Sequence, residues 1–248
     1  MIVEKVLQNE ISRKSLQTFF NDDNPAFITS LKQEISLIPD VELLGYAPRY
    51  RSEAASVALF ESFALPISVP IFVFLDQFGY SEVTSDLIRK IFRHQKCDCA
   101  FFFRTSRVIA AVTNEKVVST MDRLFGGGVL QELRRAFERD KTNREEIVLQ
   151  ALRRVMHEAG ATHFLSFPFR IHEKNSSLHH LVYLGKHERG LGLMKDIMDK
   201  ASSRHTYGVP VMGYSDVPSN PTLFETNLIP GLQGELVAEF VGRNLSVG

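Results

Sequence analysis

The sequence predicts an α/β protein whose mostly parallel sheet ends in an antiparallel hairpin. In the first half of the chain, apolar strand-like runs alternate with helical patterns of about 10 to 16 residues, which is typical of βαβ units. Ile71–Leu75 is an apolar run without alternation, as in a parallel strand covered on both faces. Residues 162–187 contain two predicted strands on either side of the polar turn Glu173–Ser176, and they predict the hairpin.

The N-terminal third is expected to alternate between helix and strand. Asp23 or Asn24 can cap a helix that begins at Pro25 and ends at Pro39. Ser52 is the expected cap of a further helix. The remaining expected elements are a helix in residues 1–15, a short strand in 16–22 and a strand in 41–46.

The central and C-terminal parts continue with strands and amphipathic helices. A helix opened by Ser81, a strand at Cys97–Phe103 and a mainly helical stretch interrupted near Thr113–Asn114 are expected. Two further helices follow, and Thr142 with Glu145 forms a capping-box pattern at the start of the second. Gly160 is expected to end that helix. After the hairpin, a helix is expected from residue 188 to residue 203.

Composition favours an ordinary globular protein. Of 248 residues, 29 are basic and 29 acidic, so zero net charge gives no support for general nucleic-acid or membrane-surface binding. No apolar run of ~18 residues and no secretory leader pattern is found, and we expect a cytoplasmic location without membrane insertion. Cys97 and Cys99 are expected to be reduced, buried thiols on one strand face. The histidines near the hairpin lack metal-ligand spacing, so no metal site is predicted.

Ligands of open parallel sheets bind at the carboxyl ends of the strands. Asp22 follows one predicted strand and can accept hydrogen bonds from a ribose, or it can take part in the helix entrance at Asp23–Pro25. Asp76 follows Ile71–Leu75 and begins the turn that runs to Tyr80. The order of residues in this turn resembles the acid-Pro-Pro-aromatic turn of amino-group methyltransferases, although the two prolines are missing. The alternative is a capping acid with Phe78 and Tyr80 packed under the next helix.

These motifs resemble those of the three-Cys-motif partner proteins (TcmP), a bacterial family named for a genomic neighbour, a three-cysteine, radical-SAM-like protein. The resemblance covers about residues 1–205. It rests on "FFND" at Phe19–Asp22, "FVFLDQFGY" at Phe72–Tyr80 and the hairpin with the helix after it. The most specific piece is the match at Lys186, His187, Gly190, Leu191, Met194 and Lys195.

The resemblance implies a Rossmann-like fold of the class I methyltransferase type over residues 1–205. Residues 206–248 would then form a linker and a partial, winged-helix-like C-terminal segment with a helical tail. S-adenosylmethionine is the implied cofactor. The cofactor-binding positions would be Asn21, Asp22, Asp76 and Gly79, and the catalytic positions would be Asp76, Phe78 and Tyr80.

Two departures from the family pattern shape the functional expectation. Gln77 stands where the family turn has a proline. The first strand, with its Asp-x-Phe-Ala-Gly-Pro-Gly turn, is not found, so we expect a sheet without its central strand. The chain would then be a truncated homologue, another segment would replace the strand, or a partner chain would supply it. One hypothesis is therefore an amino-group methyltransferase, with nucleic acid as a candidate substrate. The other is a catalytically inactive scaffold that binds a partner protein, the three-cysteine protein being the candidate.

Overall fold

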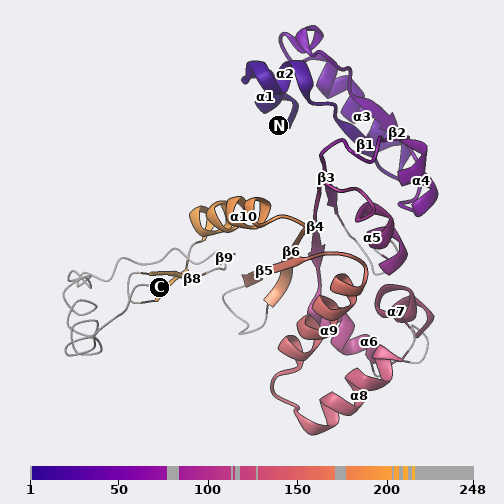
Figure 1. Ribbon diagram of the computed structural model, residues 1–248, viewed down its shortest axis with the longest axis vertical. Helices are drawn as coiled ribbons and strands as arrows, with labels where there is room; N and C mark the ends of the chain where they lie inside the picture. Colours follow the sequence, from indigo (N-terminus) through magenta and orange to yellow (C-terminus); the bar gives the residue numbers. More distant parts are fainter. Residues whose placement is uncertain are drawn as a thin grey trace, which may run out of the picture. The chain divides into compact units, whose positions relative to one another are not determined.

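The computed structural model describes most of the chain (Figure 1). The described residues are 2–76, 84–112, 114, 118–126, 128–170, 177–202, 204–206, 209–211 and 214–215. The chain divides into two compact units, Met1–Pro66 and Ile67–Gly248, and each is described by itself. The expected boundary after residue 205 stays a prediction, since few of the residues beyond it are described.

The first unit packs four α-helices and a two-stranded parallel sheet around a small core. Asn9 caps the second helix, and Asn24 caps the third through its side chain, as its position before Pro25 predicts. The core consists of Val3, Val6, Ile28, Ile35, Leu59 and Phe60. The elements before the loop at residue 37 are α1 (Ile2–Leu7), α2 (Glu10–Ser15), β1 (Phe19–Asn21) and α3 (Pro25–Ser36).

The strand expected at residues 41–46 is wrong. The backbone turns through Asp40 at φ 63° into a single 3₁₀ turn, η1 (Val41–Leu43), and the Gly45 N–H donates to the carbonyl of Arg13 at 2.8 Å. The strand is instead β2 (Arg49–Arg51), which pairs in parallel with β1. Ser52 is consequently not a cap, because α4 (Val57–Ser62) begins later and uses Ser56.

The second unit contains a mixed five-stranded sheet in the order β3-β4-β6-β5-β9. β3 pairs with β4 in parallel, whereas β4 and β5 both pair antiparallel with β6. The expected hairpin is confirmed as β5 and β6, and the sheet holds as many antiparallel as parallel pairs. The strands are β3 (Ile71–Leu75), β4 (Cys97–Phe103), β5 (His163–Arg170), β6 (Ser177–Gly185) and β9 (Tyr214–Ser215). A separate pair is β7 (Arg204–Thr206) with β8 (Val209–Val211).

β3 is an edge strand, so the expectation of a run covered on both faces is wrong. Its only partner among the described strands is β4. The side chains of Phe72 and Phe74 are 58% and 50% exposed, whereas Ile71, Val73 and Leu75 on the other face are half-buried. The run is apolar on both faces, yet only one face is covered by described residues.

Helices cover the two faces of the sheet differently. On one face, α6 contacts β6 and α9 contacts β5. On the other, α10 contacts β5 and β6 (Figure 1), and its Met198 packs with Phe167 and Tyr183. The helices of this unit are α5 (Ser85–Ile91), α6 (Thr105–Val112), α7 (Val118–Phe125), α8 (Val129–Arg139), α9 (Arg144–Glu158) and α10 (Glu188–Ala201). Over the described residues, no helix has both the length and the apolar character needed to cross a membrane.

Several sequence expectations for this unit are confirmed. Gly160 ends α9 with φ 107°, a conformation that glycine adopts without strain. The helical stretch expected after β4 is interrupted between α6 and α7, where Asn114 is non-helical. The helix after β3 is capped by Thr84, whose hydroxyl accepts from the Leu87 N–H. The expected cap of this helix, Ser81, lies outside the described residues.

Candidate functional site

Asp76 lies at the carboxyl end of the parallel β3–β4 pair, where the sequence places it. It directly follows Leu75, which is paired with Phe101 of β4, and its side chain is exposed. α6 begins two residues after the end of β4, so its first turn lies at the same end of the sheet as Asp76. Phe78, Gly79 and Tyr80 lie outside the described residues. Of the predicted catalytic residues, the structure therefore describes Asp76.

Two arginines and a histidine share this end of the sheet with Asp76. Arg104 directly follows β4, and Arg107 lies in the first turn of α6. His179 of β6 precedes His180, which pairs with Phe103 at the end of β4. Burial and the charges of Arg104 and Arg107 lower the pKa of His179, while Asp76 opposes that shift. A neutral imidazole near pH 7 follows, so the two arginines supply the local positive charge.

Aromatic rings extend from Asp76 across the same sheet face. Phe74 meets Phe102 edge-on with ring centroids 5.7 Å apart. Phe102 in turn contacts Phe169 at 5.9 Å and the His179 ring at 6.4 Å. Phe74 and Asp76 are two residues apart on an extended chain, so their side chains leave the same face of the sheet. The site therefore combines a carboxylate, an exposed aromatic surface and two cations.

Asn21 and Asp22, the other predicted cofactor residues, belong to the first unit. Asn21 uses both polar atoms of its side chain on Glu53, donating to its carbonyl at 2.8 Å and accepting from its N–H at 3.2 Å. Asn21 thus fastens the loop after β2 and does not fit a cofactor-binding role. Asp22 accepts from the Asn24 N–H at 2.8 Å through one oxygen, which is the helix-entrance alternative. The other carboxylate oxygen of Asp22 is suited to accept hydrogen bonds from ribose hydroxyls.

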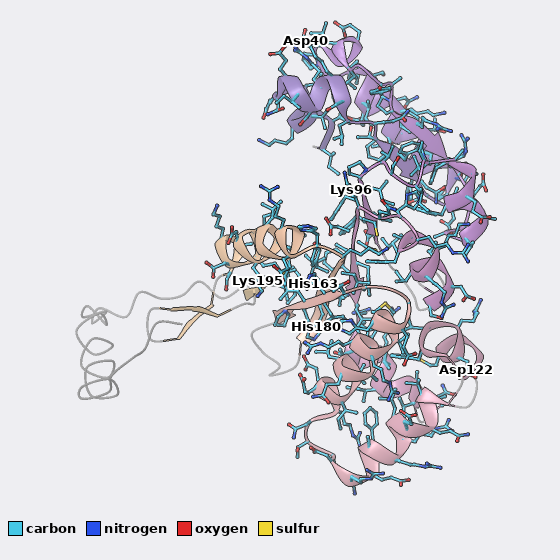
Figure 2. All side chains as sticks on the ribbon, in the orientation of Figure 1. Asp40, Lys96, Asp122, His163, His180 and Lys195 are labelled. Atoms are coloured by element: carbon cyan, nitrogen blue, oxygen red, sulfur yellow. The ribbon has the colours of Figure 1, made fainter. Side chains whose placement is uncertain are left out.

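His180, labelled in Figure 2, belongs to a polar cluster that was not predicted from the sequence. Its ring is 3% exposed and lies 2.8 Å from both Ser166 Oγ and Glu145 Oε1. The expected capping box is consequently wrong: Glu145 binds the sheet, and Asp140 instead accepts from the backbone and side chains of Thr142 and Asn143. The sequence signal was the adjacent pair His179–His180, because strand alternation sends one of the two rings into the core.

The most specific piece of the family resemblance has structural roles in this chain. Lys186 Nζ donates to the carbonyl of His94 at 2.9 Å, and His187 caps α10 by accepting from the Arg189 N–H. Gly190 lies against the hydroxyl of Tyr183, which donates to Asp98 at 2.7 Å. These contacts fix the junction between β6 and α10, so the motif by itself assigns no chemistry.

The two cysteines behave as the sequence predicts. Cys97 and Cys99 are free, buried and on the same face of β4. Burial raises the pKa of the Cys97 thiol to about 11 and raises that of Cys99 further. Such thiols are poor nucleophiles and poor metal ligands at neutral pH. Among the described residues, no cluster of three or more His, Cys, Asp or Glu side chains could hold a metal ion.

Comparison with protein-family models, curated proteins and solved structures found no match for this chain.

Proposed function

We propose that this chain is a methyltransferase-type α/β domain that binds an amine-bearing substrate at Asp76. The observation that carries the proposal is the position of Asp76, exposed at the carboxyl end of a parallel strand pair. A substrate amine at this point would donate a hydrogen bond to the carboxylate. Beside it, the exposed ring of Phe74 offers a flat apolar contact for the group that carries the amine.

The chemistry expected of Asp76 is orientation and charge compensation. A carboxylate that accepts an amine N–H directs the nitrogen lone pair away from the acid. As the nitrogen forms a new bond it becomes positive, and the nearby negative charge stabilises that state more than the ground state. Substituting Asp76 with Asn would keep an acceptor and remove the charge. We therefore expect Asp76→Asn to reduce turnover more than it weakens substrate binding.

S-adenosylmethionine, which would supply an electrophilic methyl group, remains a prediction. The residues predicted to bind it are divided between the two units, and of the pair in the first unit only Asp22 fits. Isothermal titration of the full chain with the cofactor tests the prediction. We expect measurable heat and a raised unfolding temperature at millimolar cofactor, and Asp22→Ala should weaken both. No heat together with no thermal protection would contradict this function.

A second candidate function is that of a scaffold that binds a partner protein through β3. The Ile71 N–H donates to the carbonyl of Lys96 at 2.9 Å. The backbone N–H and C=O groups of the odd-numbered residues of β3 therefore point toward β4. Phe72 and Phe74 then direct their N–H and C=O groups to the open edge. An exposed apolar edge is a ready site for an added strand. The occupant we propose is an apolar strand of the three-cysteine, radical-SAM-like protein.

Co-expression with that partner tests the second candidate. Phe72→Pro removes an N–H on the open side and leaves the ladder with β4, whereas Phe72→Leu keeps the N–H and serves as the matched control. We expect the complex to form with the Leu variant and to be lost with the Pro variant. Recovery of the chain alone, with the sedimentation coefficient of a monomer, would count against a scaffold role.

A further inference from the structure

Two positive charges lie close together at the carboxyl end of the sheet, although the formal net charge of the chain is zero. Arg104, Arg107 and Asp76 all lie close enough to His179 to shift its pKa, and the two arginines have the stronger influence. The Nε atom of Arg104 is buried and has no hydrogen-bond partner among the described residues. A buried N–H donor without an acceptor is costly, and an anionic oxygen would satisfy it. The arrangement is complementary to an anion.

Beside the cations lies a surface suited to a flat ring. Phe74 is 50% exposed and is held edge-on against Phe102, which fixes its orientation without covering it. Bases stack on exposed aromatic side chains of this kind. Phe74 stands on β3 and Arg104 follows β4, and these strands are direct neighbours. Phe74 lies opposite Ala100, and Arg104 is four residues further along, so at about 3.3 Å per residue and about 5 Å between strands their Cα atoms are about 14 Å apart. A ligand that reaches both must therefore be extended, with the long arginine side chain spanning part of the distance.

We propose that this sheet face binds a nucleoside phosphate whose base carries an exocyclic amine. The base stacks on Phe74, its amine donates to Asp76, and Arg104 and Arg107 hold the phosphate. The inference names the substrate class of the proposed amine site and rests on that function for the role of Asp76. The phosphate belongs either to a free nucleotide or to a single-stranded nucleic acid, since both present the same base, sugar and phosphate.

Three small probes separate the contributions of phosphate and amine. Adenosine 5′-monophosphate carries both groups, adenosine lacks the phosphate, and inosine 5′-monophosphate lacks the amine. Titration of each into the full chain, without any methyl donor, gives three dissociation constants. We expect adenosine to bind about tenfold or more weakly than its monophosphate, because charge-assisted hydrogen bonds are lost. The affinity for the monophosphate should also fall as salt is raised.

Matched arginine variants locate the phosphate contact. Arg104→Gln removes the charge at the proposed site, and Arg135→Gln makes the same change on the exposed surface of α8. We expect Arg104→Gln to weaken binding of the monophosphate toward the affinity of adenosine, with the contact of Arg107 retained, while Arg135→Gln leaves it unchanged. Phe74→Leu should weaken adenosine and its monophosphate equally, by about tenfold, because stacking does not involve the phosphate.

The outcomes separate this inference from the proposed function. Equal affinity for adenosine and its monophosphate, equal effects of the two arginine variants, or no binding of any probe, a single-stranded oligoadenylate included, would overturn the phosphate site. Equal affinity for the adenosine and inosine monophosphates would instead contradict the amine contact at Asp76 and leave the phosphate contact standing. A single-stranded oligoadenylate supplies the last arm. Its binding at concentrations where the mononucleotide does not bind supports the site and assigns the phosphate to nucleic acid.

Discussion

The imidazole Nε2 of His180 lies 2.8 Å from Oε1 of Glu145, and this contact joins β6 to the first turn of α9. A carboxylate can only accept, so Nε2 carries a proton, and in a neutral imidazole Nδ1 is then an acceptor. The hydroxyl of Ser166 on β5 then donates to Nδ1 at 2.8 Å. Both ring nitrogens of a buried histidine are thereby satisfied, which is what a polar group in a core requires.

Glu145→Ala is expected to lower the free energy of unfolding by about 1 to 3 kcal/mol, because it leaves the buried Nε2–H of His180 without an acceptor. Glu146→Ala is the matched control. Glu146 is exposed, and among the described residues it accepts from Gln150 one turn along the same helix, so a change within about 0.5 kcal/mol is expected. Urea denaturation of both variants gives the comparison. Equal losses of unfolding free energy in the two variants would show that the contact between Glu145 and His180 adds no stability beyond the effect of helix propensity.

Two glycines of α10 are expected to respond to alanine in opposite ways. At Gly190, a Cβ would lie 2.4 Å from the Tyr183 hydroxyl and 2.9 Å from an Asp98 oxygen, so the hydrogen bond between them would have to shift. At Gly192, nothing lies within 4 Å of the added atom. Gly190→Ala should destabilise the protein by about 1 to 3 kcal/mol. Gly192→Ala should stabilise it by up to about 1 kcal/mol.

Thermal denaturation monitored by circular dichroism distinguishes the two glycine variants. The expected result is a lower midpoint for Gly190→Ala and a higher one for Gly192→Ala, relative to the unmodified chain. Because both substitutions raise the intrinsic helix propensity equally, any difference in sign comes from the contact with Tyr183 and Asp98. A raised midpoint for Gly190→Ala would mean that α10 does not pack this closely on β6.

Elements with a strong local pattern could be predicted from the sequence, and β4 was predicted with the bounds that the structure gives, Cys97–Phe103. β2 could not, because Arg49–Arg51 has no apolar pattern and its pairing depends on a backbone bond from Arg49 to Thr18 far back in the chain. The run Val41–Tyr46 has the local pattern of a strand, but the long-range bond from Gly45 to Arg13 holds it in another conformation. Tertiary contacts therefore override local preference at both places.

The candidate site shows the same division. Asp76 was predictable because a single rule places it at the carboxyl end of a strand. The partnership of His180 with Glu145 was not, since the two residues are 35 positions apart and meet only once α9 is packed on the sheet. Burial of His180 depends in addition on the register of β6, in which His180 lies opposite Phe103 and Pro168. Neither the packing of α9 on the sheet nor the register of β6 can be inferred from a local sequence pattern.

The stability of the fold is expected to fall as the pH rises from about 9 to about 11. Burial raises the pKa of the Cys97 thiol from its ordinary value of 9.0 to about 11. Between these values the unfolded thiol loses its proton and the folded one keeps it, so the unfolded state is favoured. The stabilisation is complete below the unfolded pKa and is lost as the pH passes through the folded pKa. Cys99 and Tyr183, whose pKa values are also raised by burial, act in the same direction.

Urea denaturation at several pH values in this range measures the effect. Cys97→Ala removes one of the titrating groups, so its free energy of unfolding should depend less steeply on pH than that of the unmodified chain. Arg154→Lys changes an exposed ion pair with Glu132 and leaves the thiols in place, which makes it a suitable control. An identical pH dependence for Cys97→Ala would contradict the assignment of this loss to the buried thiol.

Neighbouring aromatic residues on β3 and β4 are expected to differ widely in what they contribute to stability. Phe101 is 0% exposed in the core, and Phe101→Ala should cost about 3 to 5 kcal/mol through lost burial and a cavity. Phe72 is 58% exposed at the sheet edge, and Phe72→Ala should cost less than about 1 kcal/mol. Urea denaturation of the isolated chain measures both. A large loss for Phe72→Ala would mean that its face is already covered, and a stacked base could not then use β3. A small loss leaves that face available, which the proposed base requires.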